Sequence, residues 1–371
     1  MKNIVVLFGG KSSEHDISLL TANLVLNAIN EEKYRIYPIF VDKNNKWFYV
    51  KDFKNNITKD NKKEEVFLTF GSPILYKKHK FTYNKFIKVD CAILCHHGLN
   101  GEDGTIQGML ELCDIPYTSS GVAQSSITMD KVFMKHLFKA LNFKTVDYDY
   151  FTIDDYKYEK ERLILKLENS LNYPLIIKPS RLGSSIGIST AKNREELIKA
   201  IELALTFDDK VLVEKMVENF KEINCACIKS LTHLIASSLE EPIKKEEILN
   251  FNDKYISGSK NSIKRKYPAK LNDKLTKEIK KMSKEIYEKF DLSGCVRIDY
   301  IVKDGEVYVN EINSIPGSLA YYLFERENLS FSEIIDLLIL KAIEKFNQKK
   351  NLTYTFESSV LNSKKLNKLK K

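Results

Sequence analysis

Residues 296–313, VRIDYIVKDGEVYVNEIN, predict a β-hairpin with polar side chains gathered on one face. Arg297 and Asp299 lie two residues apart in the first strand, and Glu311 and Asn313 lie two apart in the second, so each pair shares a face. The two carboxylates and the amide would offer three oxygen ligands beside one guanidinium. Such hard ligands suit Mg²⁺ held between carboxylates and substrate phosphates. A half-exposed hairpin with a solvated charged face is the alternative.

The strand register separates these two interpretations. A two-residue turn at 304–305 would set Asp299 opposite Asn310 and point Glu311 to the wrong side. A three-residue loop at 303–305, with its glycine left-handed in a bulge, would put Asp299 and Glu311 on one face. The metal-site hypothesis therefore predicts the three-residue loop.

Length and composition indicate a soluble globular protein. The chain has 371 residues, enough for two or three domains with hydrophobic cores, and is 43% hydrophobic and 29% charged. The longest early apolar run, Ile4–Phe8, is too short for a signal peptide or a membrane span, so no membrane partner is expected. Six cysteines, several within apolar strands, fit a reduced, cytoplasmic compartment.

The net charge of +9 is concentrated in the last residues. Residues 347–371 hold seven Lys and one Glu, which accounts for six of the nine charges. A Lys- and Asn-rich end of this kind is typical of a disordered, solubilising tail. No basic groove interleaved with aromatic residues precedes it, so nucleic acid is not an expected partner.

The N-terminal region predicts a parallel sheet. Ile4–Phe8 is a buried strand, Ser13 and Asp16 form a capping box that opens a helix through about Asn30, and Arg35–Val41 is a second strand. This β-loop-α-β order places ligands at the carboxyl ends of the strands.

The remaining elements follow from the same patterns. Residues 43–88 indicate an elaborated hairpin region. Strands are predicted at Val89–Cys95, Leu175–Lys178, Ile186–Ser189 and Lys210–Glu214. Helices are predicted at Lys131–Leu141, Arg194–Leu205, Thr276–Phe290 and Ser330–Phe346.

Two loops contain candidate ligand-binding residues. Gly10-Lys11-Ser12 is not a Walker A motif, because Val5 occupies the position of its first glycine. Glu14, at the end of the first strand, is either functional or a first-turn acid that complements the helix dipole. The segment 178–187 joins two strands through small, hydroxyl-bearing residues and is either a phosphate loop beside Lys178 or an ordinary hairpin loop.

Two further patterns each have two interpretations. The strand end near Glu214 could bind an adenine edge with its backbone, with Glu222 on ribose hydroxyls, or could be an ordinary strand boundary. Cys91 and Cys95 precede two histidines, but no second pair has zinc-site spacing, so buried thiols are the preferred interpretation, as for the pair Cys225 and Cys227.

Taken together and in this order, the motifs resemble the D-alanine–D-alanine ligase family of the ATP-grasp superfamily over about residues 3–345. The motifs that carry the resemblance are Gly9-Gly10-Lys11-Ser12-Ser13-Glu14, His97-Gly98-x-x-Gly101-Glu102-Asp103-Gly104, Asp130-Lys131, Lys178 to Gly187, Asp253-Lys254-Tyr255, Arg297-x-Asp299 and Glu311-x-Asn313-x-x-Pro316-Gly317.

The resemblance implies an α/β (α+β overall) chain with ATP-grasp architecture. It implies an N-terminal Rossmann-like substrate domain (1–119), a small central α+β subdomain (120–215) and a C-terminal subdomain with a mixed or antiparallel sheet and the metal site (216–346). The basic tail (347–371) would follow. A homodimer is a further implication.

It also implies an activity and the residues that perform it. ATP would phosphorylate one D-alanine, and the amine of a second would attack the acyl phosphate to form D-alanyl-D-alanine for peptidoglycan. The ATP-binding residues by resemblance are Lys131, Lys178, Ser185, Glu214, Lys215, Val217, Glu222 and Lys254. The metal ligands for two Mg²⁺, with Mn²⁺ able to replace them, are Asp299, Glu311 and Asn313.

The amino-acid substrates would meet a second group of residues. The catalytic set by resemblance is Glu14, Ser184, Tyr255, Arg297 and Gly317, with a Glu14–Ser184–Tyr255 link and an oxyanion site at Arg297 and the Gly317 N–H. The substrate-binding set is Glu14, His97, Ser318 and Leu323. Arg297 would act on the intermediate's oxygen rather than simply balance Asp299, and residues 244–263 would form a mobile loop.

The sequence departs from the family's pattern at the second D-alanine. Family members often place a serine several residues after Pro-Gly, whereas Tyr322 stands near that position here and Ser318 is the candidate substitute. A depsipeptide ligase using D-lactate and a non-catalytic nucleotide-binding regulator are alternative functions. Tyr255 favours the dipeptide-forming type, and retention of the metal ligands and both lysines argues against the regulator.

Overall fold

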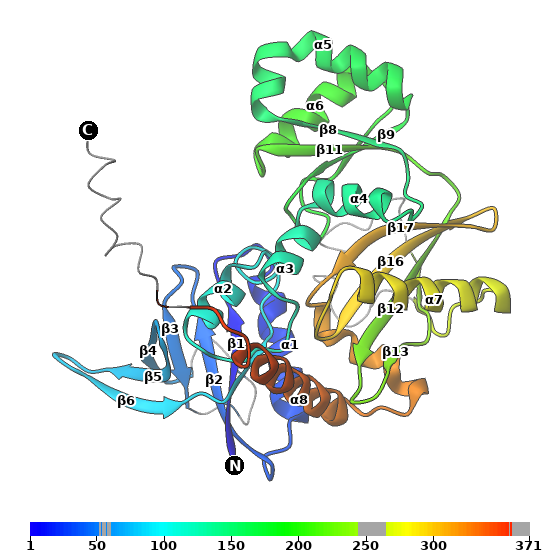
Figure 1. The fold of residues 1–371 in the computed structure, drawn as a ribbon. Coiled ribbons are helices and arrows are strands. Elements are labelled where there is room, and N and C mark those ends of the chain that lie inside the picture. Colours follow the sequence, from blue (N-terminus) through cyan, green and yellow to red (C-terminus); the bar gives the residue numbers. More distant parts are fainter. Residues whose placement is uncertain (52, 54–56, 58–60, 244–264, 356, 358–371) are drawn as a thin grey trace.

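The computed structural model describes residues 1–51, 53, 57, 61–243, 265–355 and 357 (Figure 1). Tyr255, Lys254 and the predicted loop at 244–263 lie outside these residues, as does most of the predicted tail. The strands described form three sheets of four or more strands and a two-stranded ribbon. No helix in this part of the chain has the length and apolar character needed to span a bilayer.

The N-terminal sheet has seven strands, in the order β6-β5-β4-β3-β2-β1-β7. Their bounds are β1 (Lys2–Gly9), β2 (Tyr34–Val41), β3 (Trp47–Val50), β4 (Lys63–Thr69), β5 (Ser72–Lys78), β6 (Tyr83–Lys88) and β7 (Cys91–Leu94). β1 pairs in parallel with β2 and β7, which confirms the predicted parallel sheet. β3 to β6 extend it by antiparallel pairing, as the elaborated hairpin region predicted.

The first helix begins differently from the prediction. α1 (His15–Ala28) has Glu14 at its N-cap position and no side-chain cap, so the capping box at Ser13 and Asp16 was wrong. Instead, the Ser12 hydroxyl accepts a hydrogen bond from the Glu14 N–H at 3.1 Å. The helix therefore starts with a buried acid at the carboxyl end of β1.

Three short helices lead from the N-terminal sheet to the central region. They are α2 (Thr105–Leu112), α3 (Val122–Met129) and α4 (Lys131–Ala140). α4 is capped by Asp130, whose carboxylate accepts from the N–H groups of Val132 and Phe133. The sequence predicted α4 but not the two helices before it.

The central sheet has the order β10-β9-β11-β8 and is covered by two helices. The elements are β8 (Tyr148–Thr152), α5 (Ile153–Leu171), β9 (Leu175–Pro179), β10 (Ser189–Ala191), α6 (Arg194–Leu205) and β11 (Lys210–Lys215). α6 has the predicted bounds. The strand predicted at Ile186 begins only at Ser189, because Ser184, Ser185 and Gly187 all have positive φ and keep the chain in turns.

The C-terminal sheet has the order β13-β12-β16-β17. Its elements, with the β14-β15 ribbon and the helices, are β12 (Lys221–Lys229), β13 (Leu234–Ala236), β14 (Glu241–Pro242), β15 (Arg265–Lys266), α7 (Asp273–Lys289), β16 (Val296–Lys303), β17 (Glu306–Asn313), the 3₁₀ segment η2 (Gly317–Glu327) and α8 (Phe331–Lys350). The hairpin and both long helices were predicted.

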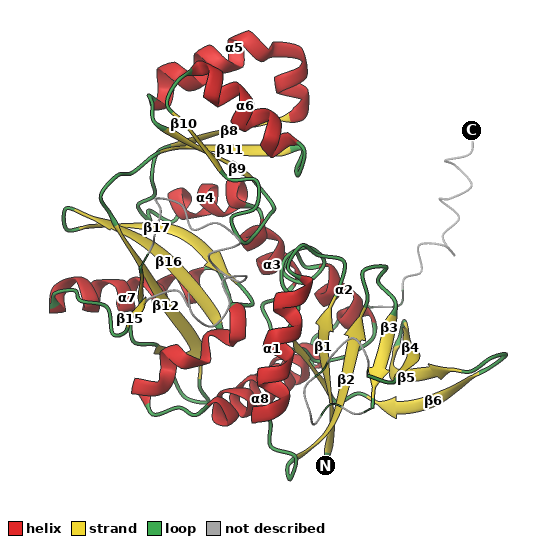
Figure 2. Cartoon of the chain, turned by 180° about the vertical axis from the view of Figure 1, so that it is seen from behind, coloured by secondary structure: helices red, strands yellow, loops and turns green. Residues whose placement is uncertain are grey.

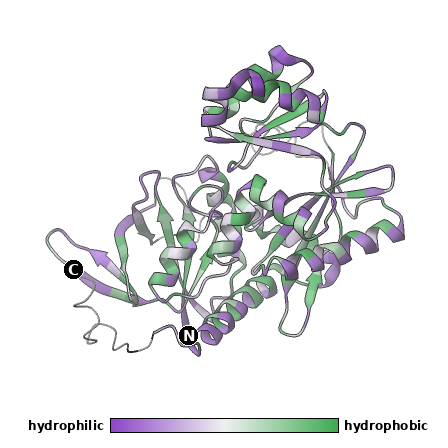
Figure 3. Ribbon diagram, turned by 45° about the horizontal axis from the view of Figure 1, so that its top comes forward, coloured by the Kyte–Doolittle hydropathy of each residue, from purple (hydrophilic) through white to green (hydrophobic). Residues whose placement is uncertain are grey.

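Three hydrophobic cores hold these layers together, and two of them combine distant parts of the sequence. The core of the N-terminal sheet includes residues of η2 and α8. Both elements contact α1, and α8 also contacts β7; Figure 2 shows α8 beside α1. The C-terminal core includes Met134 and Phe138 of α4. The central core is contiguous in sequence, from Phe151 to Val213. The helices show hydrophilic and hydrophobic stretches in alternation in Figure 3, as expected of helices that cover a sheet with one face.

The cysteines belong to these cores. All six are free and buried, which confirms the buried-thiol interpretation. Burial raises the pKa of the Cys91 and Cys95 thiols, so both stay protonated and unsuited to metal binding.

Candidate active site

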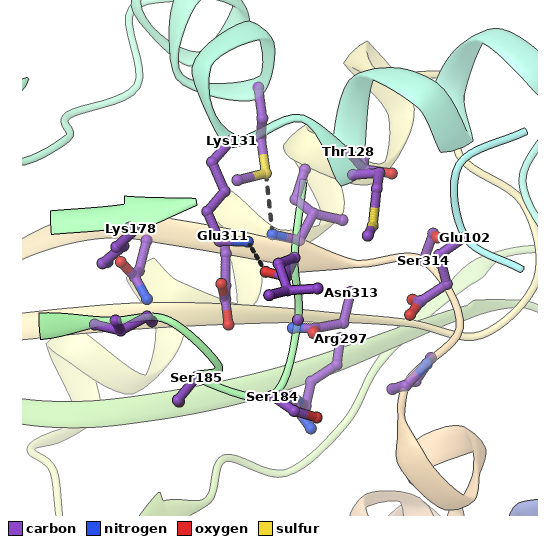
Figure 4. Close-up of a pocket in the computed structure, with 18 of the residues that line it drawn as sticks. Glu102, Thr128, Lys131, Lys178, Ser184, Ser185, Arg297, Glu311, Asn313 and Ser314 are labelled. Atoms are coloured by element: carbon purple, nitrogen blue, oxygen red, sulfur yellow. Dashed lines mark hydrogen bonds between the residues drawn. The ribbon is translucent and has the colours of Figure 1, made fainter. Parts of the chain in front are cut away.

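A pocket of about 190 Å³ is lined by residues of the N-terminal, central and C-terminal regions (Figure 4). The predicted site residues that line it are Glu14, His97, Lys131, Lys178, Ser184, Ser185, Val217, Glu222, Arg297, Glu311, Asn313 and Gly317. These residues come from all the described motifs of the sequence, so the fold brings together segments far apart in the chain. Five predicted residues in the described part of the chain do not line the pocket: Glu214, Lys215, Asp299, Ser318 and Leu323.

Asp299 and Glu311 share one face of the hairpin as predicted, but the loop and the register that place them there differ from the prediction. Lys303 pairs with Glu306, so the loop is the two-residue turn at 304–305, and the prediction of a three-residue loop was wrong. The register shifts instead between Asp299 and Tyr300, where β17 contains one extra residue, Asn310. Because of this bulge, Asp299 faces Glu311 directly.

The bulge gives one face of the hairpin four polar side chains. Arg297 lies opposite Asn313 in the register, two pairs along from Asp299 and Glu311 and therefore on the same face. Arg297 donates two hydrogen bonds to Asp299, at 2.7 and 2.8 Å, and the Asn313 amide donates a third at 3.0 Å. Arg297 thus balances Asp299 in this structure, and its further role at the intermediate's oxygen stays a prediction.

Asp299 remains difficult to ionise despite this arginine. Burial raises its pKa, Arg297 lowers it, and Glu311 and Glu222 raise it further, to about 6 in all. A cation between Asp299 and Glu311 would relieve this repulsion. A carboxylate has four lone-pair positions, so Asp299 can hold a cation and Arg297 together.

The donor set fits a hard cation better than a soft one. Within the described part of the chain, no group of three or more His, Cys, Asp or Glu residues could hold a metal ion by itself. Asp299, Glu311 and Asn313 offer two carboxylates and one amide oxygen. Such a set leaves coordination positions for phosphate oxygens and water, as Mg²⁺ requires.

Two lysines form the cationic end of the pocket. The Lys131 ammonium donates to the Leu182 carbonyl at 2.6 Å, and Lys131 and Glu311 point toward the same space in Figure 4. Lys178 pairs with Glu214. Burial disfavours the charged form of Lys178, but Glu214 outweighs it and raises the pKa of this lysine.

The loop after β9 closes over the pocket and reaches the N-terminal domain. Ser184 and Ser185 are left-handed, and the Ser184 hydroxyl donates to the Glu14 carboxylate. A Cβ on Gly183 would lie 2.5 Å from Glu14 Oε2, so a side chain at this position would displace the Glu14 carboxylate. The described part of the predicted Glu14–Ser184–Tyr255 link is thus in place.

His97 connects α1 to the segment that follows the β16-β17 hairpin. Its Nδ1–H donates to the Ile315 carbonyl at 2.9 Å, and its Nε2 accepts from the Thr21 hydroxyl at 2.8 Å. Burial lowers the pKa of His97, so the ring is held neutral in this tautomer.

Glu102 is a pocket residue to which the sequence analysis assigned no role. Burial and the nearby Glu14 raise its pKa, and two backbone donors, the N–H groups of Gly98 and Ile315, lower it, with a result of about 8. The sequence contained a signal for a role of Glu102, because this residue lies in the His97 to Gly104 motif. Its partner Ile315 is distant in sequence and could not be inferred.

Family models match two segments of the chain. The model described as D-ala D-ala ligase N-terminus matches residues 3–120, and D-ala D-ala ligase C-terminus matches residues 137–340. The chain belongs to the D-alanine–D-alanine ligase family. The D-alanine–D-alanine ligase of Thermosipho melanesiensis is 39% identical over 359 residues, covering 94% of this chain and 96% of the relative. That of Caldicellulosiruptor bescii is also 39% identical, over 368 residues, covering 95% and 98%.

Solved structures agree with this assignment. The D-alanine–D-alanine ligase from Coxiella burnetii superposes with a TM-score of 0.79 at 26% identity, covering 94% of this chain and 96% of that one. The VanG D-Ala:D-Ser ligase from Enterococcus faecalis gives 0.77 at 30% identity, covering 92% and 99%. This D-alanine–D-alanine ligase family member therefore has the ATP-grasp fold.

The region where the family often has a serine is occupied by an ionic cluster in this chain. The Tyr322 hydroxyl donates to Glu240 at 3.1 Å, the Arg265 guanidinium lies 4.5 Å from the Tyr322 ring centre, and it pairs with Glu240 at 3.3 Å. The Ser318 N–H donates to the Thr21 hydroxyl at 3.0 Å. Leu323 is fully buried.

Proposed function

We propose that this chain joins two D-alanines to D-alanyl-D-alanine, with ATP converted to ADP and phosphate through a D-alanyl phosphate intermediate, for peptidoglycan synthesis. The observation that carries the proposal is the convergence of Lys131, Lys178, Arg297 and Glu311 on one pocket in a chain of this family. Opposite ends of that pocket offer ammonium groups and carboxylates, as a polyphosphate and an amino acid require.

ATP would bind at the lysine end. Lys131, Lys178 and Ser185 are the phosphate contacts in this proposal, and Lys254 is a further one. The backbone of Lys215 and Val217 would meet adenine with help from Glu214, and Glu222 would hold the ribose. Lys131 has a pKa lowered by burial and raised by Glu311, and a bound phosphate would stabilise its charged form.

Two Mg²⁺ ions, or Mn²⁺ in their place, would be held by Asp299, Glu311 and Asn313. When bound, they would offset charge on the transferring phosphoryl group. The residues fit this role because Asp299 and Glu311 face each other across the hairpin, and burial together with the Glu311 charge raises the pKa of Asp299.

The amino-acid substrates would bind at the acidic end. In the proposal Glu14 pairs with the ammonium of the first D-alanine, with Ser184 and Tyr255 linked to it, and His97 lies beside it. Arg297 and the Gly317 N–H would stabilise the oxyanion of the tetrahedral intermediate. Ser318 and Leu323 are the proposed contacts of the second D-alanine.

The proposal also covers the localisation, the oligomeric state and the domain bounds of the enzyme. We expect a cytoplasmic homodimer, with the domains at 1–119, 120–215 and 216–346. The dimer is supported by family membership alone, and light scattering coupled to gel filtration would measure it.

Phosphate release with ATP, Mg²⁺ and D-alanine tests the activity directly. D-alanine-dependent release that is stronger than release with D-lactate or D-serine as added acceptor supports the D-Ala–D-Ala assignment. Stronger release with D-lactate would favour the depsipeptide ligase instead. Folded protein with no D-alanine-dependent release would refute ligase activity.

A further inference from the structure

Lys135, which the sequence analysis did not single out, belongs to a buried group of charges beside the pocket. Its ammonium lies 2.5 Å from Glu214 Oε1, and both side chains are 2% exposed. Glu214 Oε2 contacts the ammonium of Lys178. One carboxylate thus serves two ammonium groups, and of the two lysines Lys178 lines the pocket.

Both lysines influence the same carboxylate. Burial would raise the pKa of Glu214, but Lys135 and then Lys178 lower it to about 2. Glu214 is therefore ionised at any physiological pH. Lys135, Glu214 and Lys178 together carry one net positive charge, which lies on the side that opens to the pocket.

Stability gives little reason for a charge at position 135. The other buried residues of α4 include Val132, Met134 and Phe138, so an apolar side chain would pack into the same surroundings. Replacing a buried ion pair by well-packed hydrophobic residues is often neutral or stabilising. A charge retained here points to a role for the charge itself.

Lys135 also connects two parts of the fold. α4 packs into the C-terminal core through Met134 and Phe138, whereas Lys178 and Glu214 lie on adjacent strands, β9 and β11, of the central sheet. In Figure 1, α4 lies between the two sheets. The Lys135–Glu214 contact is therefore made across the boundary at which the pocket forms.

We propose that Lys135 is a positioning residue for ATP, which leaves Lys178 free to attract phosphate by sharing the carboxylate of Glu214. Without Lys135, the full charge of Glu214 would fall on Lys178, hold its ammonium away from the pocket and cancel its charge. The inference rests on the proposed function only in taking a nucleoside triphosphate as the ligand.

The variant Lys135→Met tests this by calorimetric binding of a non-hydrolysable ATP analogue with Mg²⁺ and no D-alanine. We expect binding to weaken about tenfold, within the range of couplings between contacting charged groups. In steady-state assays KM for ATP should rise by a similar factor, while KM for D-alanine should stay unchanged. Lys135→Arg keeps the charge and should retain most of the affinity.

Lys139→Met is the matched control. Lys139 lies one turn further along α4 and stands over the same Tyr148 ring, at 4.2 Å against 5.4 Å for Lys135, but does not reach Glu214. It should bind the analogue like the wild type. In a Glu214→Gln background, Lys135→Met should change the affinity by no more than about twofold, because the shared carboxylate is gone.

Several outcomes would overturn the inference. They are wild-type affinity in Lys135→Met, an equal loss in Lys139→Met, the same loss with and without Glu214, or parallel rises in KM for ATP and D-alanine. If Lys135→Met does not fold, Lys135→Gln carries the same expectation. A wild type that binds the analogue but releases no phosphate with D-alanine would refute the proposed reaction and leave this inference standing.

Discussion

The two ends of the pocket hold their charges in opposite ways. At the lysine end, Lys131 donates to a carbonyl and Lys178 is paired with Glu214. At the other end two carboxylates approach each other, and Glu14 raises the pKa of Glu102. The lysines therefore have partners before an anion binds, whereas the repulsion between acidic side chains at the other end persists until a cation binds. A substrate ammonium would relieve that repulsion.

The largest effect is expected between the two ends, at the hairpin. Glu311→Ala removes one of the two facing carboxylates that would hold the cation, so we expect kcat to fall by about a hundred- to a thousandfold. Phosphate release with ATP, Mg²⁺ and D-alanine measures it. Glu306→Ala is the control, since Glu306 lies at the far end of the same hairpin and pairs with Lys144 on the surface. Near-normal turnover of Glu311→Ala would remove the metal assignment.

A smaller but more selective effect is expected at the acidic end. Glu14→Gln keeps a hydrogen-bond acceptor for Ser184 but loses the charge, so kcat/KM for D-alanine should fall about a hundredfold while KM for ATP changes little. Initial rates with each substrate varied in turn would measure the split. Asp16→Asn, an exposed acid in the same helix, should behave as the wild type. If Glu14→Gln weakened ATP and D-alanine equally, the two ends would not be separate sites.

Glu102 predicts a pH dependence of stability at the acidic end. Its pKa is about 8 in the folded protein, above the usual value near 4.5, so the folded state binds the proton more tightly than the unfolded state. The stability that this proton contributes is fully present below about pH 4.5 and is lost as pH rises to about 8.

Glu102→Gln removes the titrating group and should cancel this loss, although its amide nitrogen cannot accept a hydrogen bond from one of the two backbone N–H groups that donate to Glu102. The Tm of the variant minus that of the wild type should increase by at least about 2 °C from pH 5 to pH 8. Thermal unfolding at the two values measures it. A difference in Tm that is independent of pH would show that Glu102 is already ionised in the folded protein.

The smallest effect is expected at the hairpin turn. Gly305 has φ of +82° and no atom within 4 Å of an added Cβ, so Gly305→Ala would meet backbone strain alone. The free energy of unfolding should fall by about 1 kcal/mol, with KM values unchanged. Denaturant unfolding together with steady-state kinetics checks this. A changed KM would mean that the turn, and not the bulge at Asn310, sets the position of Glu311.

The hairpin also shows how far sequence reasoning extends. Alternation of polar and apolar residues predicted the strands and their shared face, because side chains in a strand repeat every two residues. It did not predict the bulge, since Asn310 stands in an alternating strand and nothing in its neighbours marks an extra residue. The turn signal was compatible with both loops.

Residues that act through distant partners were missed. Lys135 follows the helical pattern of α4 and is identified as special only by its contact with Glu214. Glu102 gains its shifted pKa from Glu14 and from the segment at Ile315, both far away in the chain. Tertiary contacts therefore decide the roles of Lys135 and Glu102. α5 was missed for a different reason: nine of its 19 residues are charged, and it buries few residues, Leu163, Ile164, Leu167 and Leu171.

The location of α8 has a consequence for the order in which the protein folds during synthesis. The core of the N-terminal sheet includes residues 319–342. The strands β1, β2 and β7 therefore cannot complete this core until α8 has been synthesised. The central core, complete by Val213, can form much earlier. Pairing across nearly the whole chain is slow because of its loop-closure entropy. The proposed site for the first D-alanine would thus be completed after the central subdomain, to which the proposal assigns nucleotide binding.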